Sequence, residues 1–224
     1  VRLQSKRAIP NKDFILRYSL EGEAPEATIL THYEQGQGTF LLLLQPPQEL
    51  QEEEVAPREY IFVVDVSGSM NGFPLGQCRA VIRKCLSQLR PEERFNIVAF
   101  AGDAWSLWPT SRSAGEGNVQ KALSFLDRQS GGGGTEFIPA LSKALKAPEA
   151  PGYARTILFM TDGYIGYEQE VLTFMKKHLK EANLFALGVG TSVNRSLIDG
   201  MARMGLGSPS TSLRMRSPTP WCVM

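Results

Sequence analysis

Five side chains that carry oxygen atoms stand in three short segments of this chain, each next to an apolar or glycine-rich run. They are Asp65, Ser67 and Ser69 in VVDVSGSM, Thr135 in GGGGTE, and Asp162 in ILFMTDG. Mg²⁺ takes oxygen ligands in near-octahedral geometry at roughly 2.0–2.1 Å and usually keeps several waters. Two carboxylates and three hydroxyls suit that demand, so we predict a Mg²⁺ site, and Mn²⁺ or Ca²⁺ would accept the same ligands. An incomplete shell also leaves a position for a ligand from outside the chain.

Each of these residues, taken alone, has an ordinary structural explanation. Asp65 would serve as a turn or helix-capping residue, the two serines as turn formers, and Asp162-Gly163 is a common turn dipeptide. The four glycines before Thr135 would form a permissive loop. The joint arrangement favours the metal site, because a backbone that wraps a small cation closely leaves no room for bulky Cβ groups.

The segments around these residues alternate between apolar strands and amphipathic helices. YIFVVDV is apolar on both faces, which is typical of a central strand in a sheet covered on both sides. We expect further strands at 95–102, 155–163 and 183–190 and a short edge strand at 104–109. Helices are expected after Pro74 and at 118–129, 136–147, 168–182 and 194–204. This alternation predicts an α/β fold, Rossmann-like and doubly wound, with a mostly parallel sheet flanked by helices. Ligands of such sheets bind beyond the carboxyl ends of the strands, where the candidate ligands fall.

A small β segment precedes this region. DFILRYSL, ATILTHYE and TFLLLL read as strands separated by turn residues. The Pro- and Glu-rich segment 46–59 then reads as a solvated linker. We therefore expect a β unit over 1–45, a linker over 46–59 and the α/β domain over 60–204.

Composition excludes several functions. The chain has 224 residues, with 24 basic and 23 acidic side chains and a net charge of +1, which gives no electrostatic footprint for nucleic acid. No apolar run approaches the ~18–20 residues that span a bilayer. Cys78 and Cys85 fit the buried face of the helix that Pro74 opens, and we expect small core residues there rather than a disulfide.

The motif DxSGSM at 65–70, the later Thr135 and the TDG that contains Asp162 resemble the metal-ion-dependent adhesion site (MIDAS) of von Willebrand factor type A (vWA) domains. The resemblance covers roughly residues 58 to 204. It implies that Ser67 and Ser69 bind the metal directly through their hydroxyls, and that Asp65, Thr135 and Asp162 hold it directly or through water. It also implies that an Asp or Glu carboxylate from a protein partner fills the open position.

A narrower resemblance extends toward the N-terminus. IPNKDFILRYSL, FLLLLQPP and PREYIFVVDVSGSM resemble the junction after a VIT (vault/inter-α-trypsin) domain, as in inter-α-trypsin inhibitor heavy chains and related bacterial proteins. ERFNIVAF and FMTDGYIG resemble the bacterial members. The resemblance implies that 1–45 is the C-terminal β remnant of a VIT-like domain, and it suggests a cell-envelope or secreted location.

The segment 205–224 departs from this family. Related domains continue into another strand and a final helix, whereas GLGSPSTSLRMRSPTPWCVM is rich in Ser, Pro and Arg. We predict an atypical, disordered tail there.

Catalysis is the rival class of function. An apolar strand that ends in Asp superficially resembles haloacid-dehalogenase-like phosphatases, but these need a second Asp where this chain has Ser67, and no basic residue stands beside the site. A serine hydrolase would need G-x-S-x-G, which is absent here, and only His32 and His178 are available as bases. We predict a binding module and no enzyme. A Mg²⁺-dependent phosphohydrolase and a scaffold with a vestigial site stay as alternatives.

Overall fold

The structure is a computed structural model, and it describes residues 26–45, 56–180, 182–207 and 210–212. The chain divides into two compact units, Val1–Val55 and Ala56–Met224. Three segments discussed above lie outside the described residues: DFILRYSL at 13–20, positions 46–55 of the expected linker and positions 213–224 of the expected tail.

The first unit contains an antiparallel hairpin of β1 (Glu26–Glu34) and β2 (Gln37–Gln45). The two-residue turn uses Gln35 and Gly36, both at positive φ (50° and 80°), the conformation that suits the right-handed twist of a hairpin. Both expected strands that fall on described residues are thus formed.

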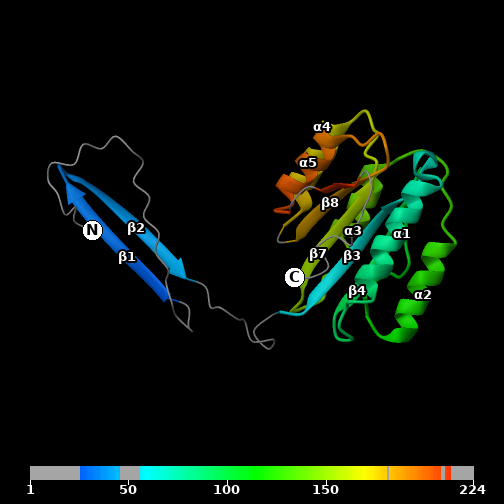
Figure 1. Cartoon of the computed structure of the whole chain (residues 1–224), viewed down its shortest axis with the longest axis horizontal. Coiled ribbons are helices and arrows are strands. Elements are labelled where there is room, and N and C mark those ends of the chain that lie inside the picture. Colours follow the sequence, from blue (N-terminus) through cyan, green and yellow to red (C-terminus); the bar gives the residue numbers. More distant parts are fainter. Residues whose placement is uncertain (1–25, 46–55, 181, 208–209, 213–224) are drawn as a thin grey trace, which may run out of the picture. The chain divides into compact units, whose positions relative to one another are not determined.

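The second unit is built on a mostly parallel sheet (Figure 1). Within the described residues its seven strands are β3 (Arg58–Asp65), β4 (Arg94–Phe100), β5 (Ala104–Ser106), β6 (Arg112–Ser113), β7 (Ala154–Thr161), β8 (Asn183–Val189) and β9 (Ser210–Ser212). The strand order is β5-β4-β3-β7-β8-β9, with β6 also paired to β4. The strands β4, β3, β7, β8 and β9 run parallel, whereas β5 and β6 pair with β4 in the antiparallel sense. The chain first adds β4, β5 and β6 on one side of β3 and then adds β7, β8 and β9 on the other side. The strand order therefore reverses at β3.

Helices cover both faces of this sheet. They are α1 (Phe73–Leu86), α2 (Glu116–Asp127), α3 (Phe137–Leu145), α4 (Glu168–His178) and α5 (Arg195–Met204). Side chains of α1 and α2 pack with one face, and those of α3, α4 and α5 pack with the other. Figure 1 shows α1 and α2 together beside β4 and β3. The predicted fold class, α/β and doubly wound with a mostly parallel sheet, is confirmed.

Strand β3 is central because its side chains are apolar on both faces. Ile61 and Val63 join the core under α3, α4 and α5, while Phe62 and Val64 join the core under α1 and α2. All four are at most 2% exposed. Full burial of one such side chain contributes roughly 1.5–3 kcal/mol, so β3 is held in place from both sides.

The structure differs from the sequence-based expectations at several boundaries. Strand β3 begins at Arg58, so the expected linker over 46–59 overlaps the sheet by two residues. The helix expected over 168–182 ends at His178. Cys78 is fully buried and Cys85 half-buried on α1, and within the described residues no disulfide joins them.

The largest difference lies after residue 204. We predicted a disordered tail over 205–224, but Leu206 forms a bridge with Leu184, and β9 pairs in parallel with the end of β8. The backbone reaches this position because Gly205 and Gly207 lie against Leu184, where a Cβ at either glycine would come within 2.4 Å of the Leu184 carbonyl oxygen. Composition alone did not reveal this close approach.

Candidate metal centre

Asp65 is the last residue of β3 and is fully buried. Its Oδ1 accepts a hydrogen bond from the backbone N–H of Ser67 at 2.9 Å. Its Oδ2 accepts a hydrogen bond from the Thr161 hydroxyl at 2.6 Å. The two bonds fix the plane of the carboxylate at the point where the central strand ends.

The two serines follow in a tight turn. The backbone N–H of Met70 donates to the Ser67 carbonyl at 3.1 Å, which begins a short 3₁₀ turn over Gly68–Met70. The Met70 side chain is fully buried and anchors this turn to the core. As a result, the Ser67 and Ser69 hydroxyl oxygens lie 3.3 Å apart, with Ser67 buried and Ser69 exposed. Two neighbouring hydroxyl oxygens therefore point to the same small volume.

The glycine-rich loop packs directly on this turn. The N–H of Gly132 donates to the Val66 carbonyl at 2.9 Å, and the N–H of Gly68 donates to the Gly133 carbonyl at 3.2 Å. A Cβ added to Gly131 would lie 2.7 Å from the Cα of Asn71, so this position has no room for any side chain. The contact brings Thr135, which follows the glycines, to the same edge of the sheet.

Thr135 is half-buried, and its backbone is held by a residue that sequence reasoning missed. The Tyr167 hydroxyl donates to the Thr135 carbonyl at 2.9 Å and accepts from the Phe137 N–H at 3.1 Å. The N–H of Glu136 donates to the Ala101 carbonyl at 2.7 Å. The loop is therefore tied both to the end of β4 and to the start of α4.

Asp162 follows β7, the neighbour of β3 in the sheet, and is 7% exposed. Its Oδ1 accepts a hydrogen bond from the N–H of Tyr164 at 3.2 Å, and its carbonyl accepts one from the N–H of Asn194 at 2.9 Å. Gly163 has φ +73°, and a Cβ there would lie 3.3 Å from the Asn194 side chain. Because Thr161 bonds to Asp65, Asp162 is placed next to that carboxylate.

At this edge of the sheet, the carboxylates of Asp65 and Asp162 lie close enough to repel each other. Burial raises the pKa of Asp65 above its usual range, hydrogen bonds from Ser67 and Thr161 oppose this, and the charge of Asp162 raises it further. A bound cation would offset both the burial and the repulsion. Among the described residues, no three His, Cys, Asp or Glu side chains cluster, so the donor set consists of two carboxylates supplemented by hydroxyls. Oxygen donors without sulfur or imidazole fit Mg²⁺, Mn²⁺ or Ca²⁺.

A model of the von Willebrand factor type A domain matches residues 58–210, which is more than half of the chain. The chain belongs to the vWA domain family. The match begins at the first residue of β3 and ends at the first residue of β9, so it spans the whole parallel part of the sheet up to that strand.

Relatives among known proteins agree with this assignment. A von Willebrand factor A domain-containing protein of Dictyostelium discoideum is 30% identical over 146 residues, covering 65% of this chain and 16% of that protein. Human von Willebrand factor A domain-containing protein 5B1 is 28% identical over 151 residues, covering 67% and 12%. Mouse inter alpha-trypsin inhibitor heavy chain 4 is 29% identical over 206 residues, covering 86% and 21%. The chain thus spans less than a quarter of the length of these relatives.

Solved structures show the same fold. A von Willebrand factor type A protein from Catenulispora acidiphila has a TM-score of 0.69 at 15% identity, covering 92% of this chain and 49% of that one. The manganese-loaded TRAP protein of Plasmodium vivax has a TM-score of 0.54 at 16% identity, covering 87% and 70%.

The sequence analysis did not predict three residues that support the candidate metal centre: Thr161, Tyr167 and Asn194. Thr161 stands directly before Asp162, and a hydroxyl at a strand end is a signal that sequence reasoning could have used. Tyr167 and Asn194 carried no such signal, because the Tyr167–Thr135 bond spans 32 residues and the Asn194 side chain bonds to Glu168 across 26.

Each histidine has a neighbour of its own. His32 belongs to the first unit and pairs with Glu34. His178 is half-buried at the end of α4, where its ring stacks on Phe174 at 4.2 Å. Within the described part of the second unit, His178 forms no hydrogen bond or ring contact with a candidate ligand.

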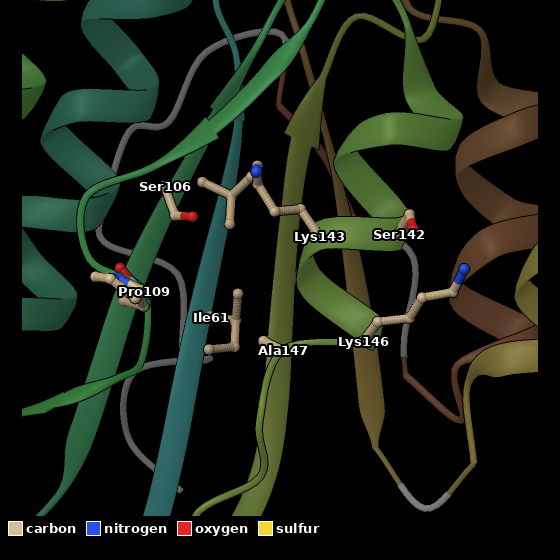
Figure 2. A pocket seen from close by; sticks show the side chains of 9 residues that line it. Ile61, Ser106, Pro109, Ser142, Lys143, Lys146 and Ala147 are labelled. Atoms are coloured by element: carbon tan, nitrogen blue, oxygen red, sulfur yellow. The ribbon is translucent and has the colours of Figure 1, made fainter.

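A separate cavity of about 280 Å³ lies between α3 and the strands β3, β4 and β5 (Figure 2). Ile61 and Val98 contribute apolar surface, and Ser106, Ser142 and Lys143 contribute polar groups. Lys146 extends away from Ile61, and its ammonium lies 5.5 Å from the centre of the Phe174 ring. None of the described residues that line this cavity carries a carboxylate. No helix in the described part of the chain is both long and apolar enough to cross a membrane.

Proposed function

We propose that this vWA domain binds a divalent cation, Mg²⁺ by preference, and through it a protein partner. Asp65, Ser67, Ser69, Thr135 and Asp162 would hold the ion, and an Asp or Glu of the partner would complete its shell. Domains of this family generally mediate protein–protein interaction. The manganese in the TRAP structure supports a divalent ion on this fold.

One observation carries this proposal: two adjacent, buried carboxylates have no positive side chain among the described residues to neutralise them. Asp65 is fully buried and Asp162 is 7% exposed, and neither forms an ion pair with any described residue. Buried charge is expensive unless it is paired or coordinates a metal. Hydroxyls of Ser67 and Ser69 at 3.3 Å from each other supply the further oxygens that a hard cation needs.

Calorimetric titration with MgCl₂ tests the metal site. We expect one ion per chain for the wild type, and loss of binding in Asp65→Ala and in Ser67→Ala. Asp127→Ala is the matched control, because Asp127 is an exposed carboxylate on α2 that pairs with Arg83. Normal Mg²⁺ binding by a folded Asp65→Ala protein would refute the proposed ligand set. A wild type that binds no ion would favour the vestigial scaffold.

Partner binding is tested by a pull-down from the native source, run with Mg²⁺ and with EDTA. Proteins retained by the wild type in Mg²⁺ should be lost in EDTA and on the Asp65→Ala column. A parallel assay with an aryl phosphate measures the phosphohydrolase alternative. Turnover that requires Mg²⁺ and is lost in Asp65→Asn would favour an enzyme over a binding module.

We also propose how the N-terminal segment and the vWA domain are organised. The match to heavy chain 4 covers 86% of this chain, more than residues 58–224 supply, so it reaches into the N-terminal segment. This supports the proposal that residues 1–45 belong to a VIT-like domain joined by a linker to the vWA domain. A cell-envelope or secreted location is likewise a proposal, which rests on the family resemblance.

A further inference from the structure

Two exposed aromatic side chains stand beside the candidate metal centre. Among the described residues of 56–224, only four large hydrophobic side chains are exposed, and two of them are Phe73 at 54% and Tyr164 at 76%. Phe73 begins α1, directly after the turn that carries Ser69, and Tyr164 lies two residues after Asp162. A single exposed aromatic needs no explanation, but two beside one site indicate a surface that a ligand covers.

The sheet order places both aromatics on the same side of Asp65. Tyr164 follows β7, and its N–H bonds to Asp162. A Cβ at Gly190, just after β8, would lie 3.7 Å from the Pro74 side chain and 3.8 Å from that of Asp162. The start of α1 therefore adjoins the Asp162 loop, and Phe73 lies on the β7–β8 side of the centre.

Two exposed carboxylates, those of Asp103 and Glu136, belong to residues whose backbones adjoin the end of β4, and the Glu136 carboxylate also accepts a hydrogen bond from the Tyr167 hydroxyl at 3.5 Å. Asp103 follows β4, and its carbonyl accepts the N–H of Ala101 at 2.8 Å. Glu136 donates its own N–H to the carbonyl of that same alanine. Within the described part of the chain neither carboxylate forms an ion pair. The loops at the end of β4 therefore present unpaired negative charge.

The loops of this edge contain no basic residue, although Arg195 directly follows the last of them as the first residue of α5. They are 65–74, 100–104, 130–137, 161–168 and 189–194. Together they carry five acidic residues, namely Asp65, Asp103, Glu136, Asp162 and Glu168, and no Lys, Arg or His. One divalent cation would leave the edge negative, and such a field favours a partner that brings positive charge close to its metal-binding carboxylate.

We propose that the partner segment carries three neighbouring features. Its Asp or Glu binds the ion, a large apolar side chain packs on Phe73 and Tyr164, and a Lys or Arg faces Asp103 and Glu136. This inference rests on the proposed function and extends it from any carboxylate to an apolar–acidic–basic segment. The acidic residue provides attachment, while the flanking residues provide selectivity.

An array of nine-residue peptides with a central Asp tests the inference directly. One flank is Leu, Phe or Ser, the other is Lys, Ser or Glu, and both orders are printed. The labelled chain is applied in Mg²⁺ and in EDTA. We expect peptides with an apolar and a basic flank to be retained about tenfold more strongly than Ser-flanked ones, in Mg²⁺ only.

Variants then assign each preference to its residues. Phe73→Ser with Tyr164→Ser should remove the apolar preference, whereas Leu206→Ser, at an 85% exposed position, should not. Asp103→Asn with Glu136→Gln should remove the basic preference, whereas Asp127→Asn should not. Mg²⁺ titrations of all variants should still show one ion per chain.

The outcomes separate the two proposals. Mg²⁺-dependent retention without any flank preference, or a preference that survives the paired variants, overturns this inference and leaves the proposed function intact. Absence of Mg²⁺-dependent retention across the whole array overturns both.

Discussion

The two ends of β3 each bury a carboxylate, but only the carboxylate at the amino end is paired with a positive side chain among the described residues. At the amino end, Glu59 is 1% exposed and accepts a hydrogen bond from the Arg155 guanidinium at 2.8 Å and another from the Ser111 hydroxyl. Arg155 also donates to the carbonyls of Ala147 and Pro148. At the carboxyl end, Asp65 accepts only neutral donors and faces a second carboxylate.

This contrast agrees with a structural role for Glu59 and with the metal-binding role proposed for Asp65. Glu59 and Arg155 stand opposite each other in the register of β3 and β7, so the fold supplies its own counter-charge there. Asp65 lies six residues after Glu59 on the same strand. Its charged neighbour is Asp162, which follows β7 and carries a second negative charge instead of a positive one. If this edge binds a cation as proposed, the ion from solution would supply the missing counter-charge, and binding could be controlled by that ion and by its further ligand.

Breaking the amino-end pair should have the largest effect. Arg155→Met leaves the Glu59 carboxylate buried without a counter-charge, and we expect the free energy of unfolding to fall by about 3–5 kcal/mol. Urea denaturation followed by circular dichroism measures this. Adding Glu59→Leu should restore most of the loss, and an unrecovered double variant would show that packing, rather than charge, holds this end.

At the carboxyl end, Mg²⁺ itself should supply the stability. At a concentration 100 times the dissociation constant, we expect the wild type to gain about 2.7 kcal/mol, read as a rise in melting temperature. Asp65→Asn should lose this gain. Without metal, Asp65→Asn should be at least as stable as the wild type, because the amide removes a buried charge beside Asp162. A marked loss of stability in the metal-free Asp65→Asn protein would contradict this view of the site.

At the carboxyl end of β3, the glycine-rich loop packs closely on the Ser67–Met70 turn. Gly131→Ala forces a Cβ against Asn71, and we expect a cost of about 1–3 kcal/mol together with weaker Mg²⁺ binding. Gly132→Ala is the matched control, because a Cβ there meets nothing within 4 Å. Urea denaturation measures the free energy of unfolding of both variants, and calorimetry measures their Mg²⁺ affinity. Equal effects in the two variants would mean that loop flexibility, rather than close approach, matters.

The smallest effect is expected at an exposed ion pair. Arg83 and Asp127 approach to 2.6 Å, but their side chains are 46% and 54% exposed. Arg83→Ala should lower the free energy of unfolding by at most about 1 kcal/mol, because solvent screens such pairs. A cost near that of Arg155→Met would show that burial is not what distinguishes the amino end of β3.

Much of the fold follows from local pattern. The alternation of apolar strands with amphipathic helices predicted the parallel sheet, and the doubly apolar sequence of β3 predicted its central place. The candidate ligands could be named because each follows a strand or a glycine run, and the carboxyl ends of parallel strands meet at one edge. Where local pattern was weak, as in the Ser- and Pro-rich segment after 204, the prediction missed β9.

The sequence by itself therefore determined the fold class and the set of oxygen-bearing residues at one edge, since both depend on periodicity and on residue type at strand ends. Only the tertiary structure decided which groups support them. The bonds from Arg155 to Glu59 and from Thr161 to Asp65 each join residues 96 positions apart. The placement of Phe73, Tyr164, Asp103 and Glu136 around the centre likewise depends on strand order. No local pattern encodes such contacts, because they arise only when β7 lies beside β3.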